Sequence, residues 1–170
     1  MTGFNDNRPR KFRIGILGSY GGLNLGDEAI LQVIVAQLRN SLPVEITVFS
    51  HNPEDTLSRH GVERALLLLE KLTREDLRPE FERMGLLVLG GGGILFDSYV
   101  RPNLRMVELA LETGTPVMVY AVGAGPLEDR HEQQIVRDCL NRAAAVTVRA
   151  KTSSKLLEEI GVRQRIEVTA

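Results

Sequence analysis

The segment GILGSYGGLNLGDEAIL, residues 15–31, has the pattern of a buried strand, a glycine-rich turn and the start of a helix. Residues 13–18 form a short apolar run of strand length, and apolar residues recur at helical spacing over residues 29–38. Glycines in the turn permit positive φ angles and a close approach by a ligand. Open α/β sheets bind ligands at turns of this kind, so the segment predicts both a fold and a site.

Two carboxylates, Asp27 and Glu28, occupy the expected start of that helix. A free helix N-terminus attracts anions, but a phosphate here would meet two like charges. Asp27 is also a natural N-cap. Asn24 and Asp27 can instead accept hydrogen bonds from the hydroxyls of a neutral polyol. The turn lacks G-x-G-x-x-G spacing and the second expected strand ends without an acidic residue, so a nicotinamide-dinucleotide site is not predicted.

The composition is that of a globular protein with one sizeable core, with 170 residues, 43% hydrophobic and 25% charged. The net charge is −1 and the only basic block is Arg8–Arg13, so nucleic acid is not an expected partner. The single cysteine, Cys139, fits a reducing compartment and packing on an apolar helix face. Residues 1–12 are polar and lack a signal-peptide core; we expect a disordered tail and a cytoplasmic protein.

Strands and helices alternate along the rest of the chain. This order predicts an α/β fold over residues 13–170, with a doubly wound, mostly parallel, Rossmann-like sheet. Residues 50–53 have turn chemistry, and we expect His51 and His60 in surface loops. The remaining expected strands are 44–49, 62–69, 86–89, 117–122, 145–148 and 165–168, and the remaining helices are 73–84, 103–113, 128–140 and 153–160.

Three glycine-rich turns and one arginine follow the carboxyl ends of expected strands. Besides the first turn these are residues 90–97, residues 123–126 and Arg149. In a parallel sheet they must line one edge, which predicts a binding crevice there. Successive amides of the glycine run can form an anion nest, and arginine binds carboxylate or phosphate in a bidentate manner. Asp97 is either a ligand-binding group or a cap, and Arg149 can equally form a surface ion pair. No His, Cys or carboxylate cluster has metal-ligand spacing.

Four motifs occur in an order that resembles the polysaccharide pyruvyl transferase family. They are NLGDEAIL at 24–31, GGGILFD at 91–97, GAGP at 123–126, and Val148-Arg149 followed by the segment 153–162. The resemblance covers nearly all residues from Arg13 onward. One departure is Ala150, where the family often has an acidic residue after the arginine.

The resemblance implies the N-terminal half of a two-domain enzyme of glycosyltransferase-B-type shape. Such an enzyme moves a pyruvyl group from phosphoenolpyruvate, its donor substrate, to two sugar hydroxyls as a ketal, without a further cofactor or metal, in cell-surface or exopolysaccharide synthesis. It further implies a C-terminal domain that is absent from this chain, so that these 170 residues alone are inactive. The sequence supplies no obvious general acid, and we expect that group in the absent domain. A lipid-linked glycan acceptor would bring peripheral membrane association.

Applied to the positions of this sequence, the resemblance implies that Asp27 or Glu28 orients or deprotonates the acceptor hydroxyl. Asn24 would bind a neighbouring hydroxyl. Arg149 and the glycine amides would take the carboxylate or phosphate of the donor. The full set of expected substrate-binding positions is Asn24, Gly26, Gly91, Gly92, Gly93, Asp97, Gly123, Gly125 and Arg149.

Two alternatives remain open at the level of sequence. One is a glycosyltransferase with a nucleotide-sugar donor, which competition between phosphoenolpyruvate and UDP-sugars would distinguish. The other is a carbohydrate-binding module without turnover, which would show sugar affinity but no transfer.

Overall fold

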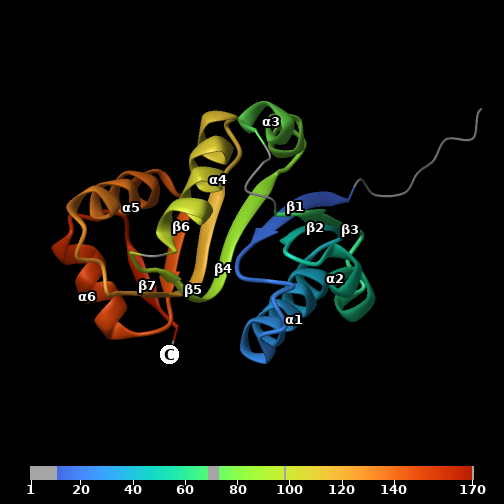
Figure 1. The fold of residues 1–170 in the computed structure, drawn as a ribbon, viewed down its shortest axis with the longest axis horizontal. Coiled ribbons are helices and arrows are strands. Elements are labelled where there is room, and N and C mark those ends of the chain that lie inside the picture. Colours follow the sequence, from blue (N-terminus) through green and yellow to red (C-terminus); the bar gives the residue numbers. More distant parts are fainter. Residues whose placement is uncertain (1–10, 69–72, 98, 170) are drawn as a thin grey trace, which may run out of the picture.

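The computed structural model describes residues 11–68, 73–97 and 99–169, and these form one seven-stranded parallel sheet with helices on both faces (Figure 1). The sheet order is β3-β2-β1-β4-β5-β6-β7. The elements in chain order are β1 Phe12–Leu17, α1 Leu25–Ser41, β2 Val44–Ser50, α2 Pro53–His60, β3 Arg64–Leu67, α3 Arg74–Glu82, β4 Leu86–Leu95, α4 Val100–Glu112, β5 Val117–Ala124, α5 Arg130–Arg142, β6 Ala145–Val148, α6 Lys151–Glu159 and β7 Ile166–Val168. The predicted doubly wound, Rossmann-like α/β fold is therefore confirmed.

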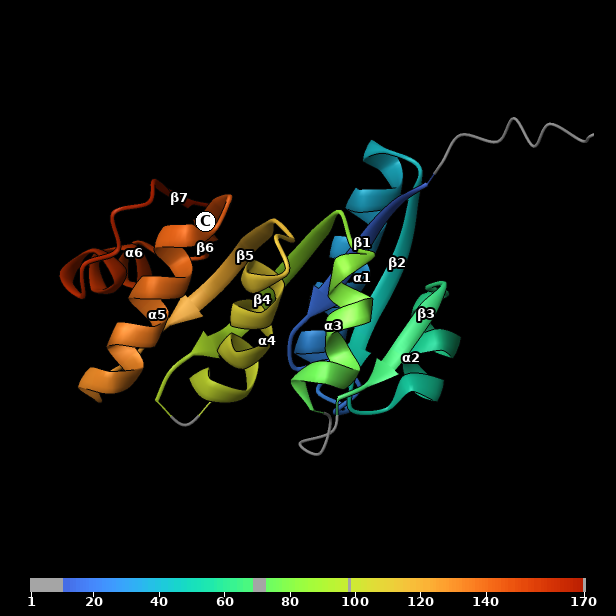
Figure 2. The same ribbon diagram turned by 90° about the horizontal axis from the view of Figure 1, so that it is seen from above.

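The sheet separates two hydrophobic clusters. On one face, Leu31, Ile34 and Val35 of α1 pack on β1, β2 and β4. On the other face, apolar residues of α3, α4, α5 and α6 pack on β4, β5 and β6. Figure 1 shows α3, α4 and α5 above the sheet and α1 and α2 below it, and Figure 2 shows the same arrangement from above. Burial of both faces explains why the strands are nearly continuous apolar runs.

The strands β1 and β4 are neighbours at the centre of the sheet. From β1 the chain continues outward through β2 to β3, and from β4 it continues in the opposite direction through β5 to β7. The connections that follow β1 and β4 therefore diverge at the carboxyl ends of these two strands. Such a switch point is the general place for a ligand in an open α/β sheet.

The glycine run 90–93 was predicted to be a turn, and this prediction was wrong because the run continues β4 as far as Leu95. Its partner is β5, where Gly92 lies opposite Val122 and Gly93 opposite Gly123. Glycine normally weakens a strand. Here it is required, because Gly91 and Gly92 have φ values of +57° and +79° and α1 lies almost in contact with the strand.

The helix α2 was missed, and the expectation of a loop was wrong. Its signals are nevertheless present in the sequence: Asn52 caps the helix by accepting a hydrogen bond from the Asp55 N–H at 3.2 Å, and Pro53 follows at the first helical position. Gly61 ends the helix in the left-handed conformation with φ +60°. We interpreted Asn52-Pro53 as turn chemistry alone because the eight-residue helix carries only a weak apolar pattern.

Most other expected elements are present, with shifted ends. Strand β3 is shorter than the expected 62–69, of which Leu69 lies outside the described residues, and α4 begins three residues before the expected Asn103. The predicted tail lies outside the described residues except for Lys11 and Phe12, and Phe12 begins β1. Cys139 is buried as predicted, and burial, followed by the charge of Glu108, raises the pKa of its thiol to about 12. No helix among the described residues is both long and apolar enough to cross a membrane.

The contact between α1 and β4 provides a test of the fold. A Cβ atom added at Gly91 would lie 2.0 Å from Cγ2 of Ile30, and it would also force an L-residue into positive φ. We expect Gly91→Ala to lower the free energy of unfolding by about 2–5 kcal/mol, measured by urea denaturation. The matched control is Gly22→Ala, because a Cβ there meets nothing within 4 Å. Equal urea midpoints for Gly91→Ala and Gly22→Ala would contradict the close approach of α1 to β4.

Candidate functional site

The loop after β1 is folded back onto the sheet by Tyr20. This tyrosine is 1% exposed, and its hydroxyl donates a hydrogen bond to the carbonyl oxygen of Gly90 at 2.7 Å. Its ring fills the space beside Gly18, where a Cβ atom would approach the ring to 2.6 Å. Burial, and then the charges of Asp27 and Glu28, raise the pKa of Tyr20 well above its ordinary value, so the hydroxyl remains a donor. The loop is thereby fixed against the middle of β4, beside the carboxyl end of β1.

Glu28 connects this loop with α1 and α2. Its Oε1 accepts the N–H of Gly21 at 2.8 Å, and its Oε2 lies 2.8 Å from Nε2 of His60. The Nδ1 of His60 lies 2.9 Å from Oε1 of Gln32. Glu28 and His60 are 4% and 5% exposed, so the expectation of a surface histidine was wrong. Because both oxygens of Glu28 have partners inside the protein, this carboxylate is suited to positioning the loop.

Asp27, its neighbour, has a different environment. It is partly buried, and its carboxylate forms no hydrogen bond or ion pair with the described residues. A Cβ atom on Gly92 would lie 3.0 Å from Oδ1 of Asp27, so the carboxylate stands directly over β4. Partial burial, and then the charge of Glu28, raise the pKa of Asp27 above its ordinary value. A partner-free carboxylate with a raised pKa is suited to accept a proton.

Asn24, rather than Asp27, is the N-cap of α1. Its side-chain oxygen accepts the N–H of Gly26 at 3.0 Å, and the predicted capping role of Asp27 was therefore wrong. Asn24 and Gly26 are both exposed. With the cap supplied by Asn24, Asp27 is left free in the first turn of the helix.

Arg149 follows β6 and lies over two glycines of neighbouring strands. A Cβ on Gly123 would lie 2.8 Å from its Nε and Nη2 atoms, and a Cβ on Gly93 would lie 3.9 Å from Nη2. Arg149 is exposed and forms no ion pair with any described residue, so the alternative of a surface ion pair does not hold within the described chain. We call Gly92, Gly93 and Gly123 the glycine floor. Asp27 and Arg149 stand over neighbouring residues of this floor.

Asp97 and Gly125 join the loops beside the floor. The carboxylate of Asp97 accepts the N–H groups of Glu128 and Asp129 at 2.8 and 3.3 Å, and its own N–H donates to the carbonyl of Pro126. Gly125, with φ +100°, donates its N–H to Leu95 at 2.8 Å. This arrangement favours the capping interpretation of Asp97, because both of its oxygens are bound by backbone.

Sequence reasoning thus placed Asp27, the glycines and Arg149 at this edge. It missed the buried side chains whose hydrogen bonds fix the surrounding loops and strands. His60 and Tyr20 were not proposed, and neither was Thr147, whose hydroxyl accepts the N–H of Ala121 at 2.7 Å where β5 is irregular. Ala121 has φ +51°, unusual for alanine. Only His60 had a usable signal, the capped helix 53–60. Within the described residues, no group of three or more His, Cys, Asp or Glu side chains could hold a metal ion.

Comparison with known proteins identifies the family of this chain and a solved structure with a similar fold. The model of the polysaccharide pyruvyl transferase family matches residues 24–170. Among solved structures, the chain is similar to the molybdenum cofactor binding protein from the phototrophic bacterium Rippkaea orientalis, with a TM-score of 0.50, 13% identity, and coverage of 89% of this chain and 98% of that chain. At that identity the likeness shows the fold alone. No individually curated protein matches the chain.

The contact between the side chains of Glu28 and His60 can be tested by a double-mutant cycle. Glu28→Ala leaves the Gly21 N–H and the His60 ring without their partner, and each buried polar group left unpaired costs about 1–3 kcal/mol. We expect His60→Ala in the Glu28→Ala background to cost less than His60→Ala alone, with a coupling of about 0.5–3 kcal/mol in urea denaturation. Asp55→Ala, which breaks an exposed ion pair with Arg59, is the control and should barely move the midpoint. Additive effects of Glu28→Ala and His60→Ala would show that the two side chains do not interact.

Proposed function

The chain belongs to the polysaccharide pyruvyl transferase family, and on this premise we propose that its glycine-floored edge transfers a pyruvyl group from phosphoenolpyruvate to two hydroxyls of a sugar. One observation carries the proposal: a carboxylate and a guanidinium, neither of which has a side-chain partner among the described residues, stand over neighbouring residues of one glycine floor at the switch point of the sheet. The first suits a hydroxyl that must lose a proton, and the second suits an anionic donor.

The reaction assigns a task to each group. Protonation of the methylene carbon of phosphoenolpyruvate makes its neighbouring carbon electrophilic. An acceptor hydroxyl attacks that carbon and gives up its proton, phosphate departs, and a second hydroxyl of the sugar closes the ketal with loss of its own proton. The net products are the pyruvyl ketal and inorganic phosphate. Asp27 is the proposed general base, and such help is worth about 10²–10⁴ in rate.

The donor is assigned to Arg149. A guanidinium presents two parallel N–H donors to a carboxylate or phosphate. The Arg149 guanidinium can lie against the sheet because Gly123 has no side chain in the space that Nε and Nη2 occupy. The side-chain oxygen of Asn24 already accepts the N–H of Gly26 at the cap of α1, so its amide N–H group remains for a neighbouring acceptor hydroxyl. Glu28 positions the loop after β1 by accepting the N–H of Gly21. Asp97 positions the loop before α5 by accepting the N–H of Glu128.

The proposal extends to the intact enzyme. A second domain would complete a glycosyltransferase-B-type arrangement and supply the general acid. No cofactor is needed besides the donor substrate. The acceptor is a sugar of a cell-surface or secreted polysaccharide, modified in the cytoplasm on a lipid carrier.

Kinetics of the intact enzyme test these roles. We expect Asp27→Asn to lower kcat about 10²–10⁴-fold with little change in KM for phosphoenolpyruvate. Arg149→Lys keeps the charge but loses the bidentate geometry, so it should raise KM for phosphoenolpyruvate about tenfold or more. Asp55→Asn, distant in the chain and paired with Arg59, is the control. Unchanged kcat and KM in both site variants would refute the assignment. Transfer from UDP-sugars would indicate a glycosyltransferase, and sugar binding without transfer would indicate a binding module.

The raised pKa of Asp27 predicts a pH dependence. The base must be deprotonated, so kcat/KM should fall as the pH drops through the pKa of Asp27, which lies above the ordinary aspartate value. Glu28→Gln removes the repelling charge but keeps an acceptor for the Gly21 N–H. We therefore expect this variant to move the acidic limb to lower pH. Glu54→Gln, an exposed change on α2, is the control. If the acidic limb of the kcat/KM profile is at the same pH in Glu28→Gln, Asp27 is not the titrating group.

A further inference from the structure

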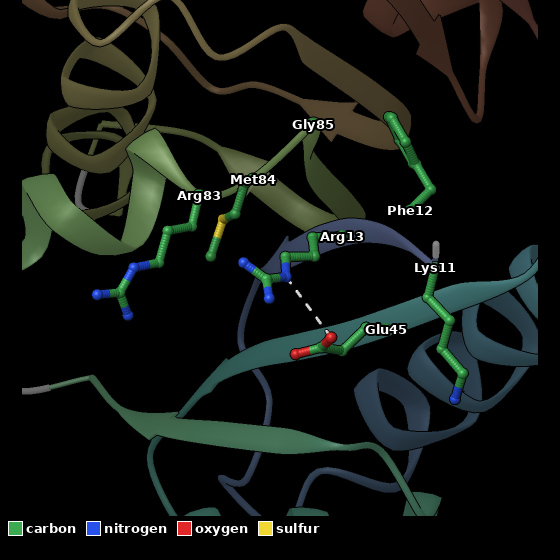
Figure 3. Close-up of a pocket in the computed structure, with 7 residues that line it drawn as sticks. All are labelled: Lys11, Phe12, Arg13, Glu45, Arg83, Met84 and Gly85. Carbon is green, nitrogen blue, oxygen red and sulfur yellow. Dashed lines mark ion pairs between the residues drawn. The ribbon is translucent and has the colours of Figure 1, made fainter. Parts of the chain in front are cut away.

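The strands of the sheet pair regularly where they begin. Figure 3 shows this end of β1 and β2, where Arg13 and Glu45 are register partners and form an ion pair at 3.5 Å. In the other half of the sheet, Val119 of β5 lies opposite Val146 of β6 in the same regular way. The pairing of β5 with β6 becomes irregular only beyond this level, on the way to the carboxyl edge.

Between this level and the carboxyl edge, β5 contains one residue more than β6. The next register pair after Val119 and Val146 is Val122 with Val148, so three steps along β5 correspond to two steps along β6. Burial agrees with this count, because these four valines all belong to one hydrophobic cluster. In a regular strand, residues 119 and 122 would face opposite sides of the sheet. The insertion is therefore a β-bulge.

The bulge contains a strained residue. Ala121 has φ +51°, a value that is unfavourable for alanine. The neighbouring strand β4 is distorted at the same level: Gly92 pairs with Val122, so Gly91, with φ +57°, lies opposite Ala121. Glycine allows β4 to adopt this conformation without strain. In β5 the surrounding structure must hold the alanine in place.

The hydroxyl of Thr147 on β6 fills the gap that the bulge leaves between the strands. It accepts the N–H of Ala121 at 2.7 Å and donates to the carbonyl oxygen of Val119 at 3.4 Å. A hydroxyl group can do both at once. Thr147 is buried, so loss of its hydroxyl would leave the Ala121 N–H without a partner inside the protein.

The extra residue decides which residue of β5 lies beside Arg149. The N–H of Arg149 donates to Val122 at 3.1 Å, and a Cβ atom on Gly123 would lie 2.8 Å from its Nε and Nη2 atoms. Without the extra residue, the pairing would move by one position, and Val122 would take the place of Gly123 on that face of the sheet. A valine side chain there would fill the space that the guanidinium occupies.

We propose that Thr147 is a positioning residue for Arg149. Its hydroxyl holds the extra residue of β5, and the resulting register puts a glycine under the guanidinium. Bulges commonly re-aim side chains beside active sites. The role of Thr147 in the register is independent of the reaction, whereas its effect on phosphoenolpyruvate rests on the function proposed above, in which Arg149 binds that donor.

Kinetics of the intact enzyme test the effect on the donor. Thr147→Val keeps the shape of the side chain but loses the hydroxyl, so it should raise KM for phosphoenolpyruvate about tenfold with a much smaller change in kcat. Thr147→Ser keeps the hydroxyl and should restore KM. The matched control is Thr115→Val, which removes another buried hydroxyl, bonded to Phe81 at 2.8 Å before β5 begins. It should leave KM unchanged.

Gly123→Ala tests the other half of the proposal and does not require Thr147→Val to fold. Its Cβ would displace the guanidinium of Arg149, so KM for phosphoenolpyruvate should rise as in Thr147→Val. Gly123 does not have a positive φ, so backbone strain does not contribute to this effect.

Hydrogen exchange of the intact protein reports the register without the reaction. Residues 117–124 should exchange faster in Thr147→Val than in the wild type or Thr147→Ser, relative to residues 44–50 of β2, because the Ala121 N–H loses its acceptor. Unchanged exchange in Thr147→Val would overturn the proposal, as would an unchanged KM in Gly123→Ala or a Thr147→Ser variant as impaired as Thr147→Val. If the wild type transfers no pyruvyl group, the proposed function fails, and hydrogen exchange alone decides the role of Thr147.

Discussion

The close contact of α1 with β4 is the constraint on which the candidate site depends. Ile30 lies where a side chain of Gly91 would be, and one turn earlier Asp27 lies where a side chain of Gly92 would be. The helix can approach so far only because the strand carries no Cβ atoms there, and the strand can hold its positive φ angles only with glycine. The same contact brings a carboxylate of the first helix over the central strand, at the point where the sheet changes direction.

Two adjacent carboxylates have different environments because of that geometry. Glu28 faces inward, where a backbone N–H and a histidine ring occupy its oxygens. Asp27 faces the strand and has no such partner, and the fixed charge of Glu28 helps to raise its pKa. Groups of the same chemical type, set apart by their surroundings, commonly divide the roles of positioning and proton transfer. The sequence GDE alone does not show which carboxylate is held by internal partners and which is not.

The alternation of strands and helices, and the edge at which Asp27, the glycine floor and Arg149 gather, could be predicted from the sequence because both follow from local patterns and from the geometry of parallel sheets. The glycine run was misassigned because its cause is not local: only Ile30, some sixty residues away in the chain, explains why a strand should contain it. The burial of His60 likewise depends on Glu28, across 32 residues. In contrast, α2 was missed despite a local signal, the Asn-Pro cap and the terminal glycine.

The arrangement also refines the argument about charge at the first helix. Two carboxylates at a helix N-terminus predict exclusion of an anionic ligand, but Glu28 is turned inward and only Asp27 presents its charge at the edge. Arg149 lies on the other part of the glycine floor, over Gly93 and Gly123. An anionic group near Arg149 would therefore not face the charge of Glu28, whose oxygens are occupied by the Gly21 N–H and the His60 ring.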